Sequence, residues 1–146
     1  MADYPEDFQK AVDDLIDNWE GTIYVKTVGD AGGATKFGIS SKAYPNLDIK
    51  KLTRDDAIAI YYRDYWLKPD LGELAASGNP DVDSLVRAKV FNMGVVMGPF
   101  TAKSLLTGCD TLQQYKMICV RHFQAIVVKN PSDGKFLKGW IRRALA

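Results

Sequence analysis

Two carboxylic acids near the N-terminus have the spacing and surroundings of a catalytic pair. Glu20 ends an amphipathic stretch and precedes Gly21, and Asp30 follows ten residues later among glycines. A glycoside hydrolase needs one carboxyl group held as an acid and a second group that stabilises positive charge on the sugar or activates water. The hydroxyl of Thr35, just past the glycines, could hold that water or a substrate hydroxyl. Together the three residues suggest cleavage of a sugar polymer.

The two acids are expected to differ in protonation. A carboxyl group in the last turn of a helix faces the negative end of the helix dipole, and burial beside Trp19 or Tyr24 would add to that effect, so Glu20 is expected to keep its proton. Asp30 lies in a turn where backbone donors and water favour the charged form. We therefore assign the general acid to Glu20 and the stabilising role to Asp30 and Thr35. Each residue alone also has an ordinary explanation as a helix end, a turn or a strand residue.

A helix and a hairpin must position these groups. Apolar residues recur at helical spacing over about residues 5–20, and Gly21 suits the end of that helix. The segments 22–28 and 35–39 are rich in β-branched and aromatic residues and flank the glycines, which predicts a short, irregular hairpin. The apolar positions of the helix are Phe8, Val12, Leu15, Ile16 and Trp19.

The remainder of the chain predicts helices. Thr53 and Asp56 form a capping-box pattern at the start of a helix that should end near Trp66, before Pro69. Further helices are expected at about 83–93, 99–106, 111–129 and from 134 to the end. The loop-like residues 77–81 are the natural boundary between two halves of one domain.

Length, charge and composition exclude several classes of protein. A chain of 146 residues is one ordinary domain, and a net charge of +1 gives no overall argument for nucleic acid or an anionic membrane. The acidic N-terminus is unlike a signal peptide, and no apolar run could span a bilayer, so we expect synthesis in the cytoplasm and no stable membrane insertion. Cys109 and Cys119 are expected to be reduced. With His122 as the only histidine, no metal or cofactor is expected.

Several segments, in order, resemble glycoside hydrolase family 108, the bacterial and phage N-acetylmuramidases. The first is Glu20-Gly21 with Asp30-Ala-Gly-Gly-Ala-Thr-Lys-Phe-Gly-Ile-Ser40. It is followed by residues 52–57 with 60–66, and by Phe91-Asn92-Met93-Gly94 with Gly98-Pro99. Residues 133–143 are similar to the close of the predicted peptidoglycan domain that accompanies this family. One departure is Thr22, where the family usually has a second glycine, so we expect an altered loop there with activity retained.

The resemblance implies a mostly helical (α+β), lysozyme-like fold: a helical bundle with a small β-hairpin lobe next to the catalytic helix. It implies one domain over residues 1–146, with a catalytic half (1–80) and a helical half (81–146). It also implies a phage-type endolysin that lyses the host by cutting peptidoglycan between N-acetylmuramic acid and N-acetylglucosamine. The acid role falls on Glu20, and its spacing from Asp30 and Thr35 is similar to the catalytic residues of T-even phage lysozymes.

Aromatic rings can stack on sugar faces, and a few side chains are candidates for such contacts. Tyr61 and Tyr65 are expected in the core instead. We expect a monomer that binds peptidoglycan glycan strands and acts after release from the host cytoplasm to the cell wall. Two alternatives stay open: a lytic transglycosylase on the same bond, and a non-catalytic peptidoglycan-binding or virion module. The candidate substrate-binding residues are Tyr24, Phe37, Tyr62, Trp66 and Asn92.

Overall fold

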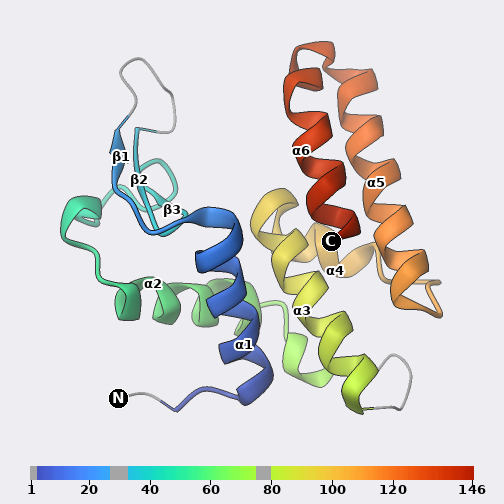
Figure 1. The fold of residues 1–146 in the computed structure, drawn as a ribbon, viewed down its shortest axis with the longest axis horizontal. Coiled ribbons are helices and arrows are strands. Elements are labelled where there is room, and N and C mark those ends of the chain that lie inside the picture. The colour runs from blue at the N-terminus through green and yellow to red at the C-terminus, as the bar shows by residue number, and fades with distance from the viewer. Residues whose placement is uncertain (1–2, 27–32, 75–79) are drawn as a thin grey trace. The chain divides into compact units, whose positions relative to one another are not determined.

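The computed structural model of the chain describes residues 3–26, 33–74 and 80–146 (Figure 1). These residues form two compact units, Met1–Asp64 and Tyr65–Ala146. The predicted division of one domain into halves near residue 80 stays a prediction, since most of that loop lies outside the described residues. The prediction of a mostly helical chain with a small antiparallel sheet is confirmed.

The first unit is built on the predicted N-terminal helix. Helix α1 (Glu6–Asp14) continues directly into a π-helical segment, η1 (Leu15–Glu20), and ends at Gly21, whose φ of 83° few other residues tolerate. Phe8 and Leu15 on its inner face are completely buried, as the apolar spacing predicts. A π-helical turn is rare and occurs frequently at functional sites, so the wide last turn draws attention to Glu20.

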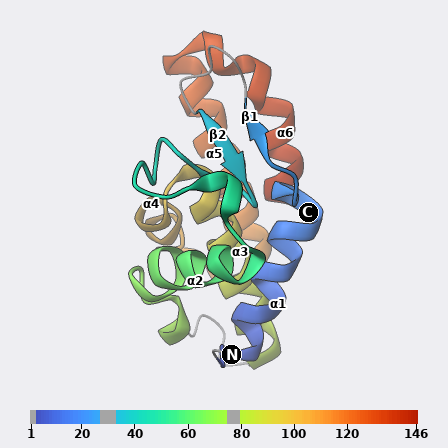
Figure 2. The ribbon, with the colours of Figure 1, turned by 90° about the vertical axis from the view of Figure 1, so that its left-hand side faces the viewer.

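A three-stranded antiparallel sheet follows this helix. Its strands are β1 (Val25–Lys26), β2 (Ala34–Lys36) and β3 (Ile39–Ser40), in the order β1-β2-β3. Figure 2 shows β1 and β2 side by side. Thr35 is paired with Val25 on one side and with Ser40 on the other. The predicted hairpin is therefore present. Strand β3 could not be predicted, because a strand of two residues is too short to show an alternating pattern.

The turn between β2 and β3 has two residues, Phe37 and Gly38, with φ angles of 53° and 79°. Two successive left-handed residues make a type I′ turn, which matches the right-handed twist of the strands it joins. Gly38 suits this conformation, whereas Phe37 occupies a region that is unfavourable for a side chain with a Cβ. The turn therefore stores a small strain, of order 1 kcal/mol or more, that neighbouring contacts must offset.

Helix α2 (Arg54–Tyr61) begins at the predicted capping box. The Asp56 N–H donates to the Thr53 hydroxyl at 3.1 Å, and the Thr53 N–H donates to the Asp56 carboxylate at 3.0 Å. The helix is preceded by a 3₁₀ turn, η2 (Ile49–Lys51), and continues as a π-helical segment, η3 (Tyr62–Leu67). The sequence therefore gave the start and the approximate end of this helix correctly.

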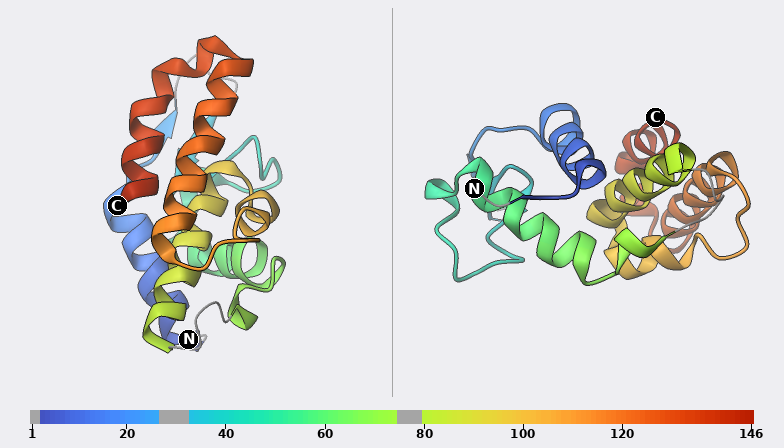
Figure 3. Two further views of the ribbon diagram at one scale, coloured as in Figure 1. Left: turned by 90° about the vertical axis from the view of Figure 1, so that its right-hand side faces the viewer. Right: turned by 90° about the horizontal axis from the view of Figure 1, so that it is seen from below.

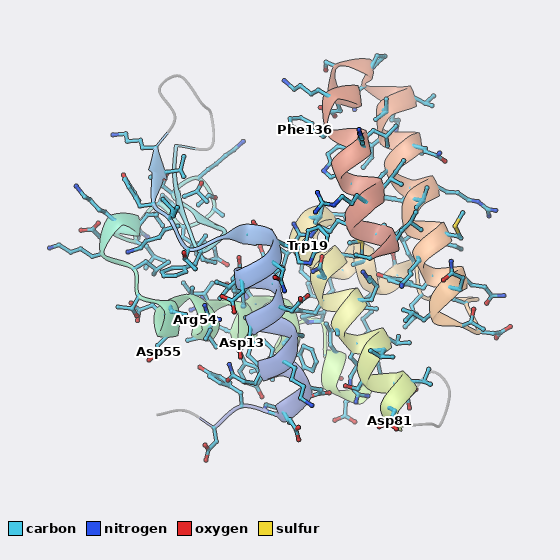
Figure 4. All side chains as sticks on the ribbon, in the orientation of Figure 1. Asp13, Trp19, Arg54, Asp55, Asp81 and Phe136 are labelled. Carbon is cyan, nitrogen blue, oxygen red and sulfur yellow. The ribbon has the colours of Figure 1, made fainter. Side chains whose placement is uncertain are left out.

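Arg54 links α2 to the first helix. Its guanidinium donates to Asp17 at 2.8 Å and to Asp13 at 2.9 Å, so two carboxylates on successive turns share one arginine (Figure 4). The hydrogen bond from Arg54 holds the pKa of Asp17 below its ordinary value of 3.8. The contact fixes the end of α1 that leads into η1, and sequence reasoning did not predict it.

In the second unit the regular elements among the described residues are all helices. Tyr115 on the long fifth helix is completely buried, and its hydroxyl donates to the Ala102 carbonyl at 2.8 Å. The last two long helices run antiparallel, side by side (Figure 3). The elements are η4 (Leu71–Glu73), α3 (Pro80–Met97), α4 (Pro99–Ser104), α5 (Leu112–Lys129), η5 (Pro131–Asp133) and α6 (Gly134–Leu145).

The two cysteines carry free thiols, as the sequence predicts. Cys119 is completely buried on α5, and burial raises the pKa of its thiol to about 11. A thiol with such a pKa is a poor nucleophile at neutral pH, so Cys119 acts as a core residue. No helix among the described residues has both the length and the apolar character that crossing a bilayer requires.

We expect Arg54→Gln to lower stability in a pH-dependent way. The pKa of Asp17 is lowered in the folded state, so its contribution is present above the ordinary pKa of 3.8 and is lost as the pH falls through the lower folded value. The difference in urea midpoint between wild type and Arg54→Gln should therefore be largest near about pH 7 and should narrow below about pH 4.

The matched control is Lys42→Gln, which removes one positive charge from an exposed position. It should leave the midpoint nearly unchanged at every pH. A difference for Arg54→Gln that stays constant across the acidic range would contradict the assigned role of the carboxylates.

Candidate functional site

Glu20 is the last residue of the π-helical segment η1 and is half-buried. The N–H of Gly21 donates to the Ile16 carbonyl at 2.8 Å, five residues back, which closes the wide final turn. With φ at 83°, Gly21 then turns the chain away from the helix axis. The carboxyl group is thus carried at the C-terminal end of a helix, as the sequence predicts.

The β2–β3 turn lies directly against the side chain of Glu20. A Cβ added to Gly38 would lie 2.9 Å from the Cβ of Glu20 and 2.8 Å from its Cγ, closer than real Cβ atoms approach other atoms. It would also overlap the hydroxyl of Tyr61. Only glycine fits here, so the absence of a side chain at position 38 allows the turn and the acid to touch.

Tyr61 holds the turn in place. Its ring is 1 % exposed, and its hydroxyl donates a hydrogen bond to the Phe37 carbonyl at 2.9 Å. This bond spans from α2 to the strained turn and restrains both left-handed residues. We refer to Glu20, Phe37, Gly38 and Tyr61 as the acid–turn cluster.

Sequence reasoning found only part of this cluster. It named Glu20 and Phe37, and it expected Tyr61 in the core, where the structure places it. It did not assign Tyr61 a role at the turn or recognise Gly38 as a contact of the acid. The sequence signal for this contact was the pair Phe37-Gly38. A Phe-Gly pair can be interpreted as a two-residue turn only when the strands on both sides of it are known.

Thr35 lies in the centre of the sheet, two residues before the turn, and is half-buried. Its strand is held at one end by Ser41, whose hydroxyl accepts from the Ala34 N–H at 3.0 Å. Gly33 is also confined there, because an added Cβ would lie 2.5 Å from the Ser41 hydroxyl. These contacts fix the register of the strand that carries Thr35. Asp30 lies outside the described residues, and its role stays a prediction.

Two predicted sugar contacts lie in or beside the sheet. Phe37 is half-buried, and the Lys36 ammonium lies over its ring at 5.5 Å from the centroid. Tyr24, also half-buried, immediately precedes β1. Their contacts with substrate stay predictions, while the structural role of Phe37 in the turn is established by its backbone.

Tyr62 belongs to a different cluster of aromatic rings. Its ring packs edge-on against Tyr4 at 4.9 Å and against Phe8 at 4.8 Å. Phe8 lies in the first turn of α1, separated from Glu20 by about 15 Å or more of helix. The structure therefore does not bring Tyr62 into the acid–turn cluster, and its ring stabilises the start of α1 instead.

Burial argues against sugar contacts by Trp66 and Asn92. Trp66 is 2 % exposed, and its ring packs edge-on against Phe91 at 5.9 Å. Asn92 is 7 % exposed, and its side-chain oxygen accepts from Arg143 Nε at 2.6 Å, which joins α3 to α6. The expectation of a surface role needs correction for both residues. Helical spacing places a ring or an amide on a face, but it does not say whether another helix covers that face.

The arrangement suits proton transfer. The turn packs against the Cβ and Cγ of a half-buried glutamate, and a positioned carboxyl group is what general acid catalysis requires. Among the described residues, no three His, Cys, Asp or Glu side chains gather as they would around a metal ion.

Comparison with known proteins identifies a family and a similar fold. The sequence model of the family described as Glycosyl hydrolase 108 matches residues 14–98, more than half of the chain. The matched region contains the acid–turn cluster, Thr35 and all of α3. No curated protein sequence gives a match.

A solved structure, that of Brucella abortus SagA, has a similar fold. It superposes with a TM-score of 0.69 at 23% sequence identity, and the alignment covers 94% of this chain and 88% of that one. At this identity the likeness concerns the fold, and it extends over helices that lie beyond the family match.

We expect Gly38→Ala to destabilise the protein strongly. Alanine adds both a left-handed backbone penalty and a clash with the Cβ of Glu20, an atom that can move only if the helix end moves. Urea or thermal unfolding should show a loss of about 2 to 4 kcal/mol.

The matched control is Gly108→Ala. Gly108 has a φ of 86°, but an added Cβ there has no neighbour within 4 Å, so this change carries the backbone cost alone. The loss for Gly38→Ala should exceed that for Gly108→Ala by at least about 1 kcal/mol. Equal losses would mean that the turn does not press on Glu20.

Proposed function

Because the chain belongs to glycosyl hydrolase family 108 and is thus a glycoside hydrolase, we propose that it hydrolyses peptidoglycan. The proposed reaction cuts the β-1,4 bond between N-acetylmuramic acid and N-acetylglucosamine, as a muramidase does. The observation that carries the proposal is the packing of Gly38 against the stem of Glu20, since it fixes one carboxyl group at a helix end within the region that the family match covers.

Glu20 is the proposed general acid. Cleavage of a glycosidic bond requires a proton on the leaving oxygen as the bond to the anomeric carbon lengthens. The contacts at Gly38 and the hydrogen bond of Tyr61 limit the directions that the Glu20 side chain can take. Such preorganisation lowers the barrier because the acid need not be oriented during the reaction.

Asp30 and Thr35 are the proposed partners of the acid. In this scheme the Asp30 carboxylate stabilises the oxocarbenium-like sugar or activates water, and the Thr35 hydroxyl positions that water. Support for Thr35 comes from its place on the central strand, two residues from the turn that touches Glu20. The product anomer would show whether water or Asp30 attacks the sugar first.

We extend the proposal to a biological role as a phage-type endolysin that lyses its host. The motifs in the first 100 residues resemble those of phage and bacterial muramidases, which supports this extension. In this role a monomer would reach the peptidoglycan strands from the host cytoplasm.

We expect Glu20→Gln to abolish cleavage while preserving the fold. Glutamine keeps the size of the side chain and its packing on Gly38 but cannot donate an acid proton, so the rate should fall by at least about a hundredfold. Release of soluble fragments from purified peptidoglycan measures the rate, and mass spectrometry of these fragments identifies the new ends.

The matched control is Glu6→Gln, an exposed glutamate of α1 that pairs with Lys10. It should cleave at the wild-type rate. Reducing ends on N-acetylmuramic acid are expected, whereas anhydromuramic ends would identify a lytic transglycosylase. Intact peptidoglycan after long incubation with folded wild-type protein would contradict the proposal and favour a binding module.

A further inference from the structure

Positive and negative residues are distributed unevenly along the chain, although the net charge is nearly zero. Residues 111–146 contain seven of the nineteen Lys and Arg residues but only one of the eighteen Asp and Glu residues, Asp133. The formal charge of this segment is therefore +6, and that of residues 1–110 is −5. The positive segment is the pair of antiparallel helices α5 and α6 (Figure 3).

Exposed lysines and exposed apolar side chains both occur close to the connection between these two helices. The lysines are exposed on both sides of the short connection through η5. Next to them in the sequence, Val128 is 83% exposed and Phe136 is 47% exposed. We call this group the hairpin tip, and it consists of Val128, Lys129, Lys135, Phe136 and Lys138.

Phe136 is held rigidly although its ring is exposed. Its ring lies 5.6 Å from that of Trp140, which in turn stacks at 5.2 Å on the buried ring of Phe123. The aromatic side chain therefore projects from a fixed base, and little conformational entropy remains to be lost when a partner covers it.

The combination favours a lipid surface over a sugar. The Lys135 ammonium lies over the Phe136 ring at 5.1 Å from the centroid, so a ring face needed for stacking on a sugar is already occupied. A nearly fully exposed valine offers a sugar or a nucleic acid no polar contact. Lysines around protruding apolar groups are typical of surfaces that lie in the interface of an anionic bilayer.

We propose that the hairpin tip docks reversibly on an anionic phospholipid bilayer. Val128 and Phe136 enter the boundary between headgroups and acyl chains, while Lys129, Lys135 and Lys138 contact lipid phosphates. The stems of the lysines can lie along the apolar groups as their ammonium groups reach the headgroups. This surface is formed by the second unit alone and does not depend on the proposed catalytic role of Glu20.

Co-sedimentation with vesicles tests the proposal. The full-length protein is mixed with vesicles of phosphatidylcholine alone or with about 30% phosphatidylglycerol, and the bound fraction is measured. We expect binding to the anionic vesicles only, with loss of binding in about 0.5 M salt. The variant Lys129→Gln, Lys135→Gln, Lys138→Gln should bind at least about tenfold more weakly.

A matched triple control separates the tip from net charge. Lys42→Gln, Lys50→Gln, Lys51→Gln removes three exposed positive charges from the first unit and should bind like wild type. A further variant, Val128→Ser, Phe136→Ser, keeps the lysines and should bind more weakly than wild type. Circular dichroism and thermal unfolding show whether each variant is folded.

Three results would overturn the proposal. One is equal binding to neutral and anionic vesicles, or to neither. Another is an equal loss of binding in the two triple lysine variants, which would reduce the effect to net charge. The last concerns the variant Lys129→Gln, Lys135→Gln, Lys138→Gln. If it no longer sediments with purified peptidoglycan but still sediments with anionic vesicles, the hairpin tip binds the cell wall.

Discussion

The close contact between the β2–β3 turn and the Glu20 side chain is the constraint on which the catalytic account depends. It requires a residue without a side chain at position 38, a left-handed Phe37, and the Tyr61 hydroxyl on the Phe37 carbonyl. The left-handed backbone of Phe37 is unfavourable by itself, and the hydrogen bond from Tyr61 helps to offset that cost. Together these features place the turn against the Cβ and Cγ of a helix-terminal glutamate, a residue that is commonly solvated.

Features formed by residues that are close together in the chain could be predicted from the sequence. The capping box at Thr53 and the apolar face of α1 are examples, and both are confirmed. Contacts between distant segments could not be predicted, since nothing in the sequence near Arg54 points to Asp13 or Asp17. The same reason explains the misplaced expectation for Trp66, because the ring that covers it belongs to α3.

The two units divide the tasks that the protein is proposed to perform. The first unit contains Glu20 and the sheet, and the second contains the basic hairpin of α5 and α6. Net charge is a poor guide to such a protein, because the opposite charges of its two segments nearly cancel. The charge of residues 111–146 taken alone is +6, which the net charge of the whole chain does not show. This local positive charge is the basis for proposing an anionic bilayer as the partner of the hairpin tip.

The most direct measurement for the central claim is a crystal structure of Glu20→Gln with a peptidoglycan oligosaccharide bound. If Glu20 is the general acid, the side-chain amide of residue 20 should lie within about 3 Å of a bridging glycosidic oxygen, with Gly38 still packed against its stem. An oligosaccharide bound with residue 20 turned away from every bridging oxygen would contradict the assignment of Glu20 as the acid.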